Sequence, residues 1–412
     1  MVRGRLRISL AVVAAVAVAE IAVLVLRPND GVIKPADVQV SAYFSDHQVD
    51  RAQDFRQPQL WLYGVTLAIQ AGVLVLLVAR PPRALKGAFR RPLLAAALTG
   101  AAISVAVNVA PLPVQLIMRE RAKDVGLVTQ PLGGYFEDVG KSLLLGGALA
   151  GGGAALAIVL MRRLPRTWWI PGAAIVFAFG VGTIYAGPVV VDPLFNRFED
   201  APPAVRADVM RIAERAGVKV GDVLSVDASQ RTTAVNAYVT GIGSTKRVVL
   251  YDNLTDDFDR RQLNVVVAHE LSHVKHNDIR TGLLFLLIVA PVGMWAVAEV
   301  TRKLGPEGAA GAQTLPALAA AIALVVTPMT LVSNQLSRGF EAHADSAALR
   351  ITDDPQAAIE FHKRLALRNV SDPDPPKWVS FVFGTHPTTL DRIGIAKAYE
   401  EHERRASRHA PH

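Results

Sequence analysis

The 412-residue chain contains no cysteine, and only 6% of its residues are aromatic and 19% charged, against 51% hydrophobic. The missing cysteines exclude disulfide bonds, thiolate metal ligands and cysteine nucleophiles, but they leave the redox compartment undetermined. Soluble proteins usually carry about 25% charged residues, so the charged fraction of this chain is low. The composition therefore favours a membrane protein.

Apolar residues are grouped in long blocks, which lie at 8–26, 60–79, 93–118, 143–161, 168–191, 283–300 and 315–332. Each block is near or above the roughly 20 residues that a helix needs to cross a bilayer. We therefore predict a mainly α-helical, polytopic membrane protein with about seven transmembrane helices. Pro111 and Pro113 interrupt the third block and leave its end undefined.

The first apolar block follows a basic start and could be a secretory signal. It lacks a clean small-x-small cleavage site followed by a polar segment, so we expect a retained first helix. Glu20 within this block is either a functional intramembrane carboxylate or a residue that faces a wet cavity or a neighbouring helix. We favour the second alternative.

The net charge of +8 would suggest nucleic acid binding only if the basic residues clustered on a folded domain. Many of them lie instead in short loops between apolar blocks, at 80–91 and 162–166. This is the pattern of loops that face the anionic lipid of a bilayer. We therefore predict a lipid bilayer as partner and no nucleic acid.

Two segments of the chain are polar, at about 192–280 and 333–412. An even number of apolar blocks, those at 283–300 and 315–332, lies between them. They therefore emerge on the same face of the membrane and can fold into one domain. In the first segment, a helical pattern opens at Pro203 and closes near Gly217. The predicted division of the chain is 1–191 (about five spans), 192–280 (first part of the polar domain), 281–332 (two spans) and 333–412 (second part and basic tail).

Strand-like runs at 234–240 and 247–251 flank the turn-like residues 241–245 and predict a β-hairpin. Asp256 and Asp257 follow it and are expected to cap the next helix.

That next helix carries the motif His269-Glu270-Leu271-Ser272-His273. On a helix the two histidines lie one turn apart on one face, so both imidazoles can reach one zinc ion. Glu270 follows the first ligand directly, where its carboxylate can act on a zinc-activated water. This arrangement is typical of metal-dependent peptide-bond hydrolysis.

Two histidines leave a tetrahedral zinc ion short of a protein ligand, with a fourth position for water. Glu341 is the best candidate, with Asp345 one turn further to orient a zinc-binding histidine. His276 is a rival, although a straight helix places it roughly 10 Å from His269. His343 is a second rival, but it points elsewhere if Glu341 faces the metal.

His386 precedes Pro387 near the end of the chain. It either stabilises the oxyanion of a tetrahedral intermediate or caps the helix that begins after the proline.

The segments HELSH (269–273), SRGFEAHAD (337–345), THPTTLDRI (385–393), Asn236-Ala237-Tyr238 and the run 192–196 together resemble the integral-membrane zinc endopeptidases of the type I CAAX prenyl protease family. The HtpX-type heat-shock membrane proteases are more distant relatives with fewer spans before the motif. The resemblance implies a zincin-like domain with one Zn²⁺ per chain.

The resemblance also implies roles for individual residues. His269, His273 and Glu341 would bind zinc, and Glu270 would be the general base. Asp345 would orient a ligand or donate a proton, and Asp278 matches a further acidic residue of the family.

The expected substrates are CAAX-type or other membrane-associated peptides or proteins, with or without a lipid group. Asn236 and Tyr238 are expected near the substrate, whose backbone would pair with the hairpin edge. The alternatives are an HtpX-type quality-control protease and a non-catalytic scaffold or transporter with a structural metal site. The basic loops favour a zinc domain outside the cell, whereas eukaryotic relatives are thought to present theirs to the cytosol, so the side stays open.

Overall fold

The structure is a computed structural model that describes residues 2–86, 90–241, 246–308 and 310–409. The helices are α1 (Val2–Leu26), α2 (Asp46–Ala79), α3 (Pro92–Val109), α4 (Leu112–Asp124), α5 (Leu132–Arg163), α6 (Trp169–Ala186), α7 (Pro203–Ala216), α8 (Asp252–Asp257), α9 (Arg260–Lys275), α10 (Asp278–Leu304), α11 (Leu315–Thr352), α12 (Pro355–Arg368), α13 (Lys377–Phe383) and α14 (Thr389–His409). The strands are β1 (Phe198–Asp200), β2 (Asp222–Val226), β3 (Ala237–Thr240) and β4 (Arg247–Tyr251).

Six of the described helices are long and apolar enough to cross a membrane, and Leu10–Leu26 of α1 is a shorter apolar helix. The prediction of a mainly helical protein with about seven spans is therefore confirmed. Many of their apolar side chains are exposed; Trp61, Leu98 and Leu144 are 80%, 62% and 77% exposed. Such surfaces fit a lipid environment, in which only helices with internally satisfied backbones or closed barrels are stable. Within the third apolar block, helix α3 ends at Val109, and Pro111 lies between α3 and α4.

Helices α3 and α5 approach each other closely through small residues. A Cβ atom added to Gly100 would lie 2.4 Å from Cβ of Ala154 and 2.7 Å from the carbonyl oxygen of Ala150. A Cβ atom added to Gly151 would lie 2.8 Å from the carbonyl oxygen of Ala97. Small residues at such contacts let membrane helices pack backbone against backbone.

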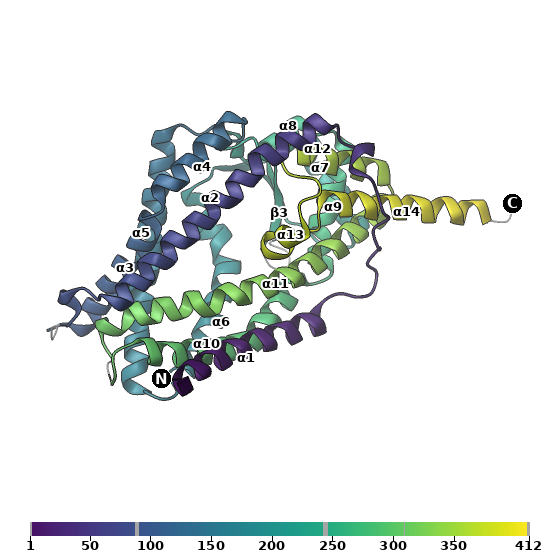
Figure 1. The fold of residues 1–412 in the computed structure, drawn as a ribbon. Helices are drawn as coiled ribbons and strands as arrows, with labels where there is room; N and C mark the ends of the chain where they lie inside the picture. Colours follow the sequence, from purple (N-terminus) through teal and green to yellow (C-terminus); the bar gives the residue numbers. More distant parts are fainter. Residues whose placement is uncertain (1, 87–89, 242–245, 309, 410–412) are drawn as a thin grey trace.

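Helix α1 packs along α10 and α11 (Figure 1). Oε2 of Glu20 accepts a hydrogen bond of 3.0 Å from Nε2 of Gln335 on α11. Glu20 therefore faces a helix neighbour, as favoured from the sequence.

The four strands form one sheet in the order β1-β2-β4-β3. Strand β2 runs parallel to β4, whereas β3 pairs antiparallel with β4 in the register Ala237–Leu250 and Thr240–Arg247. The predicted pairing of the two strand-like runs is thus confirmed, although residues 242–245 of the expected turn lie outside the described residues. Strand β3 is an edge of this sheet, and it packs against α9.

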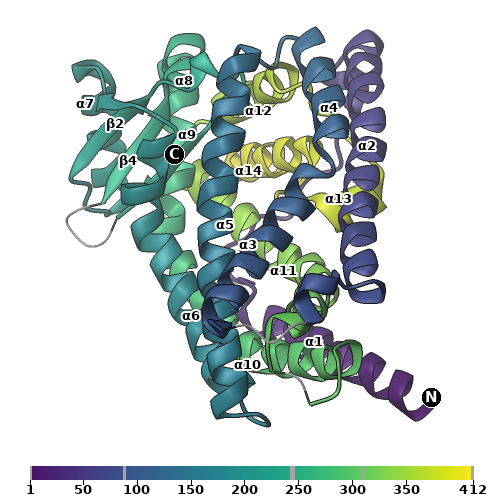
Figure 2. The same ribbon diagram turned by 90° about the vertical axis from the view of Figure 1, so that its left-hand side faces the viewer.

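The polar segments share one hydrophobic core. Ile212 of α7, Val248 of β4 and Leu271 of α9 are buried together with Ala348 of α11 and Phe361 of α12. Figure 2 shows the sheet and α7 beside α9, on the opposite side of the molecule from α2 and α4. The two polar segments therefore fold together, while the domain boundaries given above stay a prediction.

The expected cap of the motif-bearing helix was wrong. Asp256 and Asp257 belong to the short helix α8, and Asp259 is the N-cap of α9. The Asp259 side chain accepts a hydrogen bond from the backbone N–H of Gln262, and the Gln262 side-chain oxygen accepts one from the backbone N–H of Asp259. This reciprocal pair requires a residue directly before the first helical turn, a position that Asp256 and Asp257 do not occupy.

Candidate metal centre

Three predicted ligands converge from two helices. Helix α9 places His269 and His273 one turn apart, and the long helix α11 brings Glu341 to them. Their ligand atoms all lie within 4.8 Å of one another. Nε2 of His269 is 3.2 Å from Nε2 of His273 and 3.1 Å from Oε2 of Glu341. The structure therefore brings the predicted metal ligands together.

The far nitrogen of each histidine is anchored by a carboxylate. Nδ1 of His269 lies 2.8 Å from Oδ1 of Asp345, and Nδ1 of His273 lies 2.7 Å from Oδ2 of Asp278. With Nδ1–H donated to a carboxylate, the Nε2 atom of each neutral ring presents a lone pair. The sequence had placed Asp345 in this position, and Asp278 had been noted only through the family resemblance.

The arrangement fits a bound divalent cation. Two Nε2 lone pairs that face each other at 3.2 Å repel unless a cation lies between them. Zinc–nitrogen bonds of about 2.0–2.1 Å in a tetrahedron place two nitrogens roughly 3.3 Å apart, close to the separation seen. Oε2 of Glu341 is buried and has no hydrogen-bond partner, as expected of an atom meant for a metal.

The charges around the centre also favour a cation. Burial alone would lower the pKa of His269, but the carboxylate of Asp345 beside it raises this pKa to about 10. The surroundings thus favour a positive charge at the imidazole, and a divalent cation at Nε2 would supply this charge in place of a proton and leave the ring itself neutral. Burial raises the pKa of the Glu270 carboxyl, which makes Glu270 a stronger base than an exposed glutamate.

Arg392 of α14 is a site residue that the sequence reasoning missed. Its guanidinium forms a two-point ion pair with Asp345, and both side chains are largely buried. Arg392 lies within the quoted segment 385–393, but an arginine in a helix start gives no sign of its partner. The partner is 47 positions away, so only the folded chain shows this contact.

His386 lies beside the ligands. Its Nε2 is 3.3 Å from Oε2 of Glu341, and its Nδ1 is 2.9 Å from the hydroxyl of Thr385. The alternative role as a helix cap is not supported, because Thr388 and Asp391 exchange the capping hydrogen bonds of α14. His386 is thus placed to reach a group bound at the centre, and its role stays a prediction.

The two rival ligands contact each other instead of the centre. The rings of His276 and His343 stack with their centroids 4.0 Å apart. Neither histidine belongs to the group of converging ligand atoms among the described residues.

The two predicted substrate-binding residues lie at the sheet edge. Asn236 is exposed directly before β3, and its side-chain oxygen accepts a hydrogen bond from the backbone of Ala237. The hydroxyl of Tyr238 donates to Asp192, 3.1 Å away, and burial beside this carboxylate raises the pKa of the phenol. Tyr238 is therefore engaged within the protein, whereas Asn236 is accessible.

The fold and the centre define a class: a multi-span membrane protein in which a HExxH helix and a glutamate from a second helix bring together three side chains that could hold a metal ion. Residues 201–400 match the profile of Peptidase family M48, and residues 39–197 match that of the CAAX prenyl protease N-terminal region with five membrane helices. Residues 201–400 therefore form a region of the M48 metalloprotease family, and the membrane helices before it are similar to those of CAAX prenyl proteases. Residues 39–197 hold α2 to α6.

Individual relatives agree with this assignment. The chain is 29% identical over 250 residues to the uncharacterized metalloprotease YhfN of Bacillus subtilis. The matched region covers 58% of this chain and 59% of that protein. It is 28% identical over 266 residues to the CAAX prenyl protease 1 homolog of Oryza sativa subsp. japonica, covering 61% of this chain and 60% of the relative. The chain thus spans about 60% of the length of these curated relatives.

The fold also matches a crystal structure of Ste24p from S. mikatae. The TM-score is 0.71 at 17% sequence identity, and the match covers 95% of this chain and 99% of that chain. At this identity the similarity describes the fold, and the prediction of a polytopic membrane protein with a small sheet is confirmed.

Proposed function

We propose that this protein is a membrane-embedded zinc metalloendopeptidase. The observation that carries the proposal is the convergence of His269, His273 and Glu341 on one point, with Glu270 following the first ligand in the chain. The three ligand atoms leave a fourth tetrahedral position for a reacting molecule. A closed structural site would instead supply a fourth protein ligand.

The residues around the centre have separable tasks. Bound zinc would supply Lewis-acid activation of a water and of the scissile carbonyl. Glu270 would accept the proton from the attacking water and pass it to the leaving amine. Asp345 and Asp278 hold the Nδ1 protons of the two imidazoles, which keeps both Nε2 lone pairs directed at the centre.

His386 is suited to a role in the transition state. Partial desolvation lowers the pKa of His386 below the usual histidine value, which favours the neutral ring. If Nδ1 accepts a hydrogen bond from the hydroxyl of Thr385, Nε2 carries the proton and can donate a hydrogen bond to a developing oxyanion beside Glu341.

A peptide substrate would extend the sheet. Strand β3 is an edge strand that packs on the motif-bearing helix α9, so a peptide paired with β3 would pass next to the ligands. Pairing through the backbone binds many sequences with little demand on side chains. Exposed Asn236 would contact such a peptide, whereas Tyr238 would position the strand through Asp192.

The proposal is tested with Glu270→Gln in purified protein in detergent. The variant should bind one zinc ion per chain, as the wild type does, and should cleave an unstructured reporter peptide at least about 100-fold more slowly. Glu214→Gln, on the exposed face of α7, is the matched control and should cleave normally. Full activity of Glu270→Gln would end the assignment, and zinc binding without cleavage by the wild type would favour a scaffold or transporter.

The CAAX-type relatives suggest a substrate class. A peptide with a C-terminal CAAX sequence should be tested with and without a thioether-linked isoprenoid. Faster cleavage of the modified peptide supports CAAX processing, and equal cleavage of both, together with cleavage of unrelated unfolded membrane proteins, supports the quality-control alternative.

A further inference from the structure

A second site lies far from the metal centre, at the opposite end of the membrane helices. A cavity of about 660 Å³ opens where α2 ends, α3 begins and α11 begins. Leu77 of α2 and Pro316 of α11 form its sides, and α3 forms its floor. Apart from Thr99 and two arginines, every residue that lines it is apolar.

The floor runs along one face of α3. Leu94, Leu98, Ala102 and Ala106 recur every four residues and line the cavity together. Twelve residues of helix separate the first from the last of them, a length of roughly 18 Å. One leaflet of a bilayer has a hydrocarbon depth of about 15 Å, half of the whole core. The groove therefore has the depth of a single leaflet.

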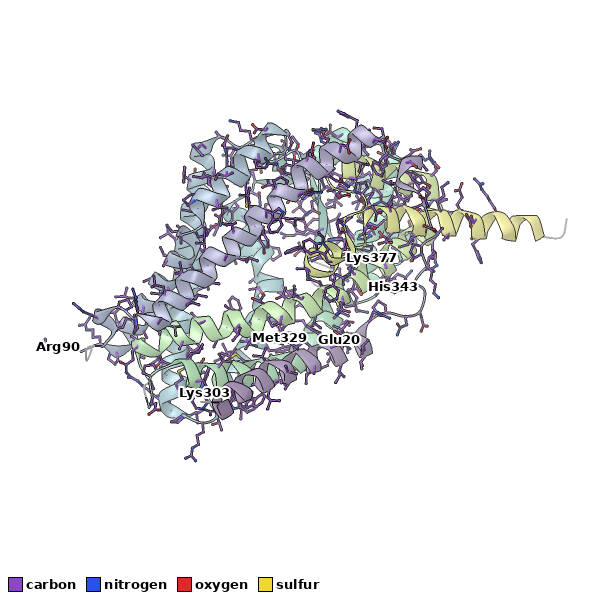
Figure 3. All side chains as sticks on the ribbon, viewed as in Figure 1. Glu20, Arg90, Lys303, Met329, His343 and Lys377 are labelled. Carbon is purple, nitrogen blue, oxygen red and sulfur yellow. The ribbon has the colours of Figure 1, made fainter. Side chains whose placement is uncertain are left out.

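The mouth of the groove is cationic. Arg90 and Arg91 lie directly before α3, line the cavity and are exposed. Figure 3 shows Arg90 at the end of the molecule far from His343. Guanidinium groups bind phosphate oxygens with two parallel hydrogen bonds, and two of them here stand above an apolar channel.

We propose that this groove binds an anionic phospholipid, with the phosphate at Arg90 and Arg91 and one acyl chain along Leu94, Leu98 and Ala102. Charge complementarity at the mouth and the leaflet depth of the floor both point to this occupant. A peptide segment is a poor fit, because Thr99 alone would face its backbone polar groups within the groove.

The test uses the full chain in phosphatidylcholine vesicles that contain a trace of phosphatidylglycerol with a photoreactive acyl chain. Labelling of the 94–106 segment is measured by mass spectrometry and compared with labelling by the equivalent photoreactive phosphatidylcholine. Phosphatidylglycerol should label this segment roughly 10- to 30-fold more efficiently, because each of the two arginines near the surface contributes about fivefold or slightly less.

Two variants separate the contribution of the headgroup to lipid binding from that of the acyl chain. Arg90→Gln with Arg91→Gln should reduce labelling by phosphatidylglycerol to the phosphatidylcholine level. Ala102→Phe fills the groove without changing charge and should displace the label from the segment. Arg163→Gln with Arg166→Gln removes the same charge from another loop at this end and should leave labelling unchanged.

Three outcomes would overturn the proposal. Equal labelling of wild type by both lipids would show that the groove has no headgroup preference. An equal loss in the Arg163/Arg166 control would show diffuse electrostatic attraction. Unchanged labelling in Ala102→Phe would show that the acyl chain lies elsewhere. Unchanged peptide cleavage by all variants is expected and shows that each one folds.

Discussion

Asp345 and Arg392 form a buried ion pair in which Nε lies 2.8 Å from Oδ2 and Nη2 lies 2.6 Å from Oδ1. The same Oδ1 atom lies 2.8 Å from Nδ1 of His269. The arginine therefore fixes the carboxylate, and the carboxylate fixes the ring that faces the metal centre. Three elements, α9, α11 and α14, meet at this one oxygen.

Asp345→Asn should lower zinc affinity by about 10- to 100-fold, the usual cost of removing a group that orients a metal ligand. Both carboxylate oxygens of Asp345 accept hydrogen bonds, so an amide must turn its NH₂ group toward a donor of Arg392 or of His269. Affinity is measured by competition with a chelator of known strength. Asp256→Asn, an exposed aspartate of α8, is the control and should bind zinc as the wild type does. Unchanged affinity in Asp345→Asn would contradict this role.

Asp208 should stabilise the polar domain in a pH-dependent way. It is 2% exposed on α7 and pairs with Arg260 and Arg211. The hydrogen bond from Arg260 holds the pKa of Asp208 below its usual value. A depressed folded-state pKa means that the stabilisation is full above the unfolded-state pKa of about 3.9 and is lost as pH falls through the folded value.

Asp208→Asn should therefore lower the thermal midpoint by a few degrees at pH 7, roughly the effect of 1 kcal/mol or slightly more. The difference from wild type should shrink as the pH falls below about 4. Midpoints are measured from pH 3 to pH 8, again with Asp256→Asn for comparison. A difference that stays constant over this range would show that packing, and not charge, carries the effect.

Gly100→Ala should weaken the contact between α3 and α5. The new methyl group would meet Ala154 and the backbone of Ala150, neither of which is a flexible side chain, so the helices must separate. Overpacking of this kind costs about 1–3 kcal/mol. Gly152→Ala on α5 has no neighbour within 4 Å and is the matched control. The free energy of unfolding of both variants is measured in mild detergent. Equal effects of the two changes would argue against close packing of α3 on α5.

The sequence was sufficient for features that depend on neighbours in the chain. Apolar blocks defined the spans, and the spacing of His269 and His273 defined their shared helical face. Glu341 was expected beside the two histidines because a zinc site needs a third protein ligand, and the structure brings its carboxylate to them. Arg392 was not found, because its pairing with Asp345 depends on how α11 and α14 pack. The cap at Asp259 was missed for a local reason: three aspartates lie within four residues, and spacing alone does not choose among them.

The distribution of charge predicts which side of the membrane carries the metal centre. Arg80, Arg83, Arg90 and Arg91 lie in the loop before α3, and the ends of α5 and α10 add further basic residues, among them Lys303. Figure 3 places Arg90 and Lys303 toward one end and His343 toward the other. Basic short loops stay in the cytoplasm, so the metal centre should face the opposite side. Alkaline phosphatase fused after His412 should be active in a bacterial membrane, and the same enzyme inserted after Arg166 should be inactive. The reverse pattern would show that the large polar domain, and not the short loops, determines orientation.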